Sequence, residues 1–65
     1  MGSNGSITFY SFEPILKALA SIPAEMANRV QGEYYILEVF ARPHRYQLRE
    51  EPVATWEVEV EFYQK

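Results

Sequence analysis

The chain has no cysteine, only one histidine and no long apolar run. Without cysteine it can form neither a disulfide nor a thiolate metal site. No apolar segment approaches the length that spans a bilayer, and the opening residues lack the charged and apolar regions of a signal peptide. We therefore expect a cytoplasmic protein that is not attached to a membrane. Basic residues are also outnumbered, 6 to 9, which disfavours, rather than excludes, a nucleic-acid partner.

The chain is short but rich in apolar residues. Its 65 residues are 48% hydrophobic and 15% aromatic. A domain of this size buries only about 60% of its unfolded surface. Either the core is unusually aromatic, or part of the apolar surface is buried against another copy, and we favour a homo-oligomer. Residues 1–6 have the composition of a flexible segment, native or left by expression, so we place the single domain at residues 7–65.

The tail of the chain, residues 55–62, alternates strictly between two kinds of side chain. Its apolar members are Trp56, Val58, Val60 and Phe62, and its acidic members are Glu57, Glu59 and Glu61. Successive side chains of a strand point to opposite faces. The segment is therefore predicted to be a strand with one apolar and one anionic face.

A short β-prone run at residues 7–10 precedes a predicted helix. Ser11 is a suitable N-cap, and Pro14 is tolerated in a first turn. Pro23 interrupts the pattern, so the segment is either one kinked helix or two helices that meet at Ser21. Gly32 is predicted to end it in a left-handed conformation. The expected apolar stripe is Ile15, Leu16, Leu19, Ile22, Met26 and Val30.

Residues 33–42 form a second predicted strand that is apolar on both faces. By simple alternation, Tyr34, Ile36 and Phe40 share one face with Glu38 and Arg42. An antiparallel sheet covered by one helix should be polar on its far side. This mixed face therefore predicts a second packed layer, which we interpret as another subunit.

The order of the elements defines the fold class. We predict an α+β domain with β-α-β-β order, in which a kinked or broken helix packs on one face of an antiparallel sheet. The sheet has three strands, or four if the residues after Pro43 form a short strand of their own. Glu50, Glu51 and Pro52 are expected to form a turn.

The sequence offers little for catalysis. His44, the single histidine, has no nucleophile or carboxylate at a motif spacing, so we expect no enzyme. Glutamates at alternate strand positions lie about 6.5–7 Å apart, too far for a compact metal site without other oxygens. We therefore predict neither a metal nor a resident cofactor.

One basic segment remains, and it allows two interpretations. Arg42, Arg45, Tyr46 and Arg49 could bind phosphate and stack on a base, or dock an acidic protein surface. Alternatively, the arginines pair across the hairpin with the tail glutamates, which requires no outside partner. We favour the second interpretation.

The length, the β-α-β-β order and the alternating final strand resemble those of dodecin, a small flavin-binding protein that assembles into a hollow shell. The resemblance implies an oligomer that binds flavin or another flat ligand. Where dodecins place a flavin-stacking tryptophan, this chain has Tyr35, and Glu57 stands where they have a flavin-contacting glutamine. Trp56 lies beside that position, so Tyr35 and Trp56 are the stacking candidates.

Three functional hypotheses follow. The leading one is a non-enzymatic protein-interaction and self-assembly module, open to a regulatory role. Its candidate partner-binding residues are Tyr34, Ile36, Phe40, Arg42, Arg45, Tyr46 and Arg49. The alternatives are a dodecin-like flat-ligand binder and a nucleic-acid-associated protein that uses the basic segment.

Overall fold

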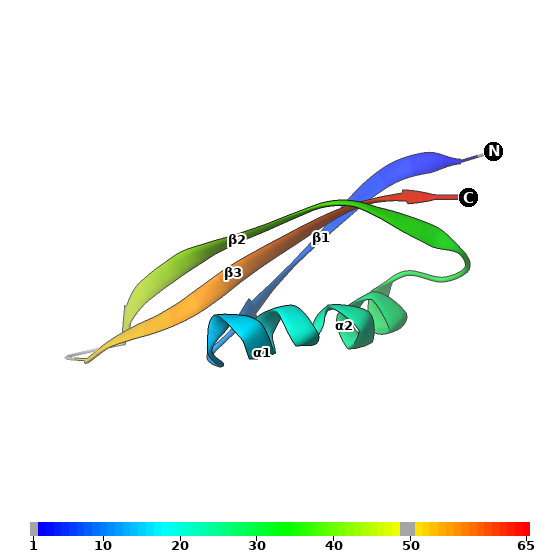
Figure 1. Cartoon of the computed structure of the whole chain (residues 1–65). Coiled ribbons are helices and arrows are strands. Elements are labelled where there is room, and N and C mark those ends of the chain that lie inside the picture. The colour runs from blue at the N-terminus through cyan, green and yellow to red at the C-terminus, as the bar shows by residue number, and fades with distance from the viewer. Residues whose placement is uncertain (1, 49–50) are drawn as a thin grey trace.

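The computed structural model describes the backbone of residues 2–48 and 51–65 and the side chains of residues 2–44 and 56–65. The chain forms β1 (Ser3–Ser11), α1 (Ile15–Ala20), α2 (Ile22–Arg29), β2 (Tyr34–Leu48) and β3 (Glu51–Gln64). The strands make one antiparallel sheet in the order β1-β3-β2 (Figure 1). The predicted α+β class, the element order and the three antiparallel strands are therefore confirmed.

The first strand begins earlier than its β-prone run indicates. Ser3 pairs with Gln64 and Ser6 with Glu61, so residues 3–6 belong to the sheet rather than lying outside the domain. Their small side chains suit a strand crossed by aromatic rings. A Cβ atom on Gly5 would lie 2.8 Å from the Cζ atom of Phe62, its cross-strand partner, so only glycine fits without a shift. β1 therefore starts four residues before the strand predicted at residues 7–10.

The helical region starts later than predicted and bends at Ser21. Pro14 occupies the N-cap position of α1, while the Ser11 hydroxyl accepts a hydrogen bond from the Glu13 amide at 3.1 Å. Ser21 keeps a helical backbone between α1 and α2, and its hydroxyl donates to the Lys17 carbonyl at 3.1 Å instead of capping α2. Pro23 has no N–H to continue the ladder, which accounts for the bend.

The core is one cluster of buried side chains from β1, the helices, Val30 and β3. Met26, Ala18, Val58 and Val60 are completely inaccessible to solvent. Leu16, which we expected in the helix stripe, is 78% exposed, and Ala18 takes the inner position instead. Leu16 and Ala18 are about 200° apart around a helix, so they cannot share the inner face, which Ala18, Ile22 and Met26 occupy at intervals of four residues. The full cluster is Phe9, Ala18, Ile22, Met26, Val30, Val58, Val60 and Phe62.

The C-terminal end of the helical region is tied to the sheet at two points. Arg29 donates from Nη1 to the Thr8 carbonyl at 2.6 Å, which joins α2 to β1. The connection from α2 to β2 contains Gly32, whose φ of +87° is the predicted left-handed conformation. Near it, the Gln64 side-chain amide donates to the Gln31 carbonyl. These contacts fix the entry of the chain into β2.

β2 is a long strand with a bulge near its start. It continues through Pro43 to Leu48, so the segment after Pro43 extends β2, and no separate fourth strand occurs in the described residues. The pairing with β3 shifts register between Ile36 and Glu38. A bulge adds one residue to the strand and so shifts the alternation by one. Residues before and after it that simple alternation would place on the same face therefore lie on opposite faces.

The helices cover only part of the sheet. Figure 1 shows both helices on one side, and the described parts of β2 and β3 extend beyond the start of α1. α1 packs mainly on β3 and α2 on β1. β2 therefore forms an edge of the sheet that receives little helical cover.

Candidate functional site

The sheet face opposite the helices, here called the open face, is organised by the alternation of β3. Val58, Val60 and Phe62 enter the core, so the intervening Glu57, Glu59 and Glu61 point to the open face. The predicted division of this strand into an apolar and an anionic face is confirmed. Because β3 is the central strand, the three carboxylates run along the middle of the open face.

Arg42 on β2 bridges two of these carboxylates. Its Nη2 donates to Oε1 of Glu59 at 3.3 Å, and its Nη1 lies 3.8 Å from Oε2 of Glu57. The Arg42 side chain is about half exposed, so solvent screens the pairs and they stabilise the fold only modestly. The predicted cross-strand pairing is thus confirmed for Arg42.

His44 joins this network from the end of the glutamate row. Its Nδ1 lies 4.0 Å from Oε1 of Glu57, and its ring centroid lies 4.9 Å from that of Tyr10. Tyr10 comes from β1, so these contacts cross the full width of the sheet. Among the described residues, no three His, Asp or Glu side chains are arranged to hold a metal ion.

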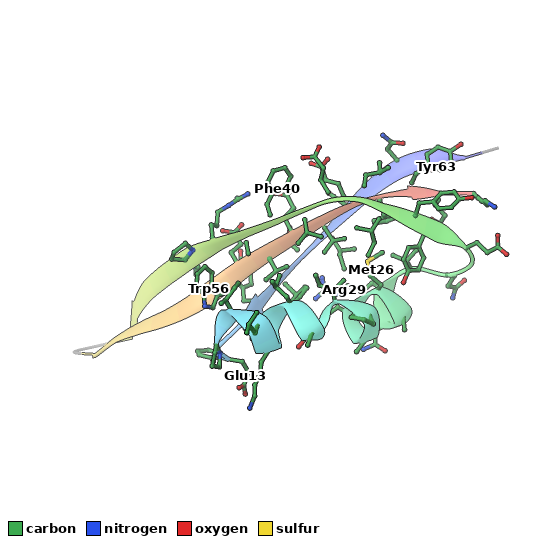
Figure 2. The ribbon with its side chains drawn as sticks, viewed as in Figure 1. Glu13, Met26, Arg29, Phe40, Trp56 and Tyr63 are labelled. Carbon is green, nitrogen blue, oxygen red and sulfur yellow. The ribbon has the colours of Figure 1, made fainter. Side chains whose placement is uncertain are left out.

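Apolar side chains concentrate on β2. Among the β2 residues whose side chains the structure describes, five are large, apolar and exposed, and we call them the β2 surface: Tyr35, Ile36, Leu37, Val39 and Phe40. They lie on both faces of the strand, and those on the helix side stay exposed because the helices reach mainly β1 and β3. Figure 2 shows Phe40 projecting from the open face, on the side of the sheet away from Met26. An apolar edge strand of this kind is rarely left uncovered in a soluble protein.

The bulge changes the grouping that we predicted. Tyr34 and Ile36 pair with Gln64 and Phe62, on the helix side, whereas Phe40 pairs with Glu59 on the open face. Tyr34 packs against the core, and its ring lies 6.3 Å from that of Phe62 in an edge arrangement. The prediction that Tyr34, Ile36 and Phe40 share one face was therefore wrong, because simple alternation cannot reveal the extra residue of a bulge.

The two predicted stacking residues lie on opposite sides of the sheet. Tyr35 pairs with Tyr63 on the open face, whereas Trp56 packs against the core on the side of the sheet that faces the helices (Figure 2). The Nζ atom of Lys65 lies 5.1 Å from the centroid of the Tyr35 ring and occupies one of its faces. Within one chain, Tyr35 and Trp56 cannot enclose the same ligand.

The rest of the basic segment is defined only by its place in the register. Arg45 pairs with Ala54 and Tyr46 with Val53, so neither stands opposite a tail glutamate. Their side chains, together with Arg49 and Glu50, lie outside the described residues. Arg42 is the member whose contacts are seen, and it is already engaged with Glu57 and Glu59.

A small hollow lies where the bulge meets the N-terminal end of β1. It measures about 250 Å³ and is lined by Asn4, Gly5, Ser6, Leu37, Glu61 and Phe62. Drug-sized ligands generally occupy pockets of about 300–1,000 Å³, so the hollow is small for a flavin. The sequence did not predict it because neither the bulge nor the role of residues 3–6 was recognised.

Comparison with known proteins does not extend these observations. No protein-family model, no curated protein and no solved structure matches the chain. The resemblance to dodecin therefore rests on length, element order and the alternating final strand, and no comparison supports it. Within the described part of the chain, no helix has the length and apolar character needed to cross a membrane.

Proposed function

We propose that the protein is a non-enzymatic association module that self-assembles through β2. The observation that supports this proposal is the β2 surface: five large apolar side chains exposed on one edge strand. In the part of β2 that the structure describes, apolar side chains are exposed on both faces, and the strand lies at one end of the sheet. A second sheet edge would cover apolar area and pair backbone groups at the same time.

A second copy of the chain is the partner that fits the surface best. The open face of β2 carries both signs of charge, Glu38 and Arg42, around the apolar Phe40. A surface with both signs can complement itself across a two-fold axis. The small size of the domain adds a reason, since an interface increases the apolar area buried per chain. The cytoplasmic location remains a prediction from the sequence.

The experiment that tests the proposal is light scattering on Phe40→Glu beside a matched control. Phe40 is 38% exposed on β2, and Leu16 is a more exposed apolar residue on α1. Phe40→Glu places a carboxylate opposite Glu59 and in the interface, so we expect a shift toward monomer. Leu16→Glu carries the same chemical change away from β2 and should retain the native mass.

Unfolding must be separated from dissociation in this experiment. Phe40→Thr keeps a β-prone residue without adding charge, and circular dichroism reports whether each variant is folded. Folded Phe40 variants that keep the native mass would contradict assembly through β2. Native protein that is monomeric at every concentration would contradict self-assembly altogether.

The two alternative functions have less support. A flat ligand could stack on the exposed ring of Tyr35, and its binding would appear as bound 450 nm absorbance or as quenched Trp56 fluorescence with riboflavin. In nucleic-acid binding, Arg42 would contact a phosphate beside Glu57 and Glu59, whose negative charges repel that phosphate. Such binding would appear as a DNA or RNA mobility shift that weakens steeply with salt.

A further inference from the structure

The outer edge of β2 limits how two copies can join. β2 is the last strand of the sheet, so its outward N–H and C=O groups have no neighbouring strand. A copy that pairs with it antiparallel is related by a two-fold axis perpendicular to the sheet. Such an axis preserves the faces of the sheet, and directly opposed residues must share a face. Beyond the bulge, the axis therefore lies between one residue of β2 and the same residue of the second copy. We describe each position of the axis by that residue.

The charges on the open face distinguish the possible positions of that axis. An axis at residue 38 or 42 would place Glu38 against Glu38 or Arg42 against Arg42, both of which are repulsive. An axis at residue 39 would oppose Glu38 to Phe40. An axis at residue 41 would oppose Arg42 to Phe40 and Glu38 to His44. Only an axis at residue 40 places Glu38 opposite Arg42, and it does so twice.

We propose that two copies pair β2 against β2 in antiparallel orientation, centred on Phe40, to make one continuous six-stranded sheet. This inference rests on the proposed function and adds the partner strand, the register and the charge pairs. Phe40 meets Phe40 of the second copy on the axis. On each side of this contact, Glu38 of one copy meets Arg42 of the other.

The environment of Glu38 supports this register. Glu38 lies directly opposite Glu61 in the sheet, a like-charge pair that destabilises the single chain. Among the described residues, no cation forms an ion pair with Glu38. Arg42 of a second copy would supply one. The Arg42 side chain is about half exposed, and its guanidinium has five N–H donors, more than the contacts with Glu57 and Glu59 use.

The two irregular positions of β2 also agree with this register. An axis at residue 40 opposes Pro43 to Leu37, the residue at the bulge. Proline in a sheet belongs on an edge strand with its missing N–H directed outward, and bulges likewise interrupt pairing. The outward backbone groups would then be those of Val39 and Ala41, which have the same parity as Pro43. They form the central ladder, and the proline and the bulge end it on both sides.

Single cysteines test the register directly, because the native chain has none. Phe40→Cys should form a disulfide-linked dimer under mild oxidation. Directly opposed residues have Cα atoms about 4.5–5.5 Å apart, which suits a disulfide. Leu16→Cys, exposed on α1, is the control for random collision. We expect Phe40→Cys to cross-link about tenfold faster or more, because assembly raises the local thiol concentration.

A second pair of variants removes the concern that replacing Phe40 weakens assembly. In the proposed register Glu38 lies about 13 Å along the strand from Glu38 of the other copy, given the rise per residue. Glu38→Cys alone and Arg42→Cys alone should therefore cross-link no faster than the control. An equimolar mixture of the two should give the mixed dimer, identified by mass spectrometry.

The outcomes separate this register from the broader proposal. The register is supported if Phe40→Cys cross-links rapidly and the mixture of Glu38→Cys and Arg42→Cys does so too, while neither of these two variants cross-links rapidly alone. The register is overturned if the native protein is oligomeric by light scattering but Phe40→Cys and the mixture both cross-link as slowly as Leu16→Cys. In that case the protein assembles through another contact. Monomeric native protein with no cross-linking overturns both.

Discussion

Met26 is the side chain whose removal should cost the fold most clearly. It projects from α2 between the helices and the sheet and is completely inaccessible to solvent (Figure 2). Met26→Ala leaves a cavity, and replacing a buried Leu, Ile or Met by Ala costs about 2–5 kcal/mol. At about 0.05–0.15 kcal/mol per residue, 65 residues give a total stability of about 3–10 kcal/mol. The substitution should therefore remove about half of the stability or unfold the protein.

Urea unfolding followed by the fluorescence of Trp56, the only tryptophan, measures this loss. Met26→Leu keeps the volume and should cost less than about 1.5 kcal/mol. Leu16→Ala removes an exposed side chain from α1 and should leave stability within about 0.5 kcal/mol. Each variant is measured at several protein concentrations, because assembly adds to the apparent stability. A loss below about 1 kcal/mol for Met26→Ala, or a larger loss for Leu16→Ala, would refute this description of the core.

Two further substitutions test the sheet. Gly5→Ala places a methyl group against the Phe62 ring and should lower the free energy of unfolding, measured in urea, by about 1–3 kcal/mol. Ser3→Ala is the control and should lower it little. Equal, small effects of the two substitutions would mean that residues 3–6 do not pair with β3. Arg42→Ala, measured at concentrations where the chain is monomeric, should cost about 1 kcal/mol or less, and the difference should shrink in high salt. A large, salt-independent loss would show that Arg42 contributes by packing rather than by charge.

The sequence predicted best those elements whose periodicity is long and regular. Alternation in β3 gave the correct faces for Val58, Val60 and the glutamates, because a central strand covered on one side must alternate. Gly32 was also predicted correctly, since few other residues adopt a positive φ. These features depend on local chemistry, which is visible in the sequence.

Features that depend on distant contacts were not predicted. The bulge between Ile36 and Glu38 has no local marker, yet it moves Phe40 away from the face of Tyr34. Gly5 has the composition of a flexible segment, and its close contact with the Phe62 ring arises only when β1 pairs with β3. The limited reach of the helices leaves β2 exposed, and this follows from packing rather than from any residue of β2.

Assembly through β2 is the central claim, and sedimentation equilibrium of the native chain tests it most directly. Across about a hundredfold dilution, mass action predicts that the average mass falls toward the 7.6 kDa of one chain and rises to a multiple of it at high concentration. The same series with folded Phe40→Thr should remain near the single-chain mass. A native mass of 7.6 kDa throughout the range would contradict the claim.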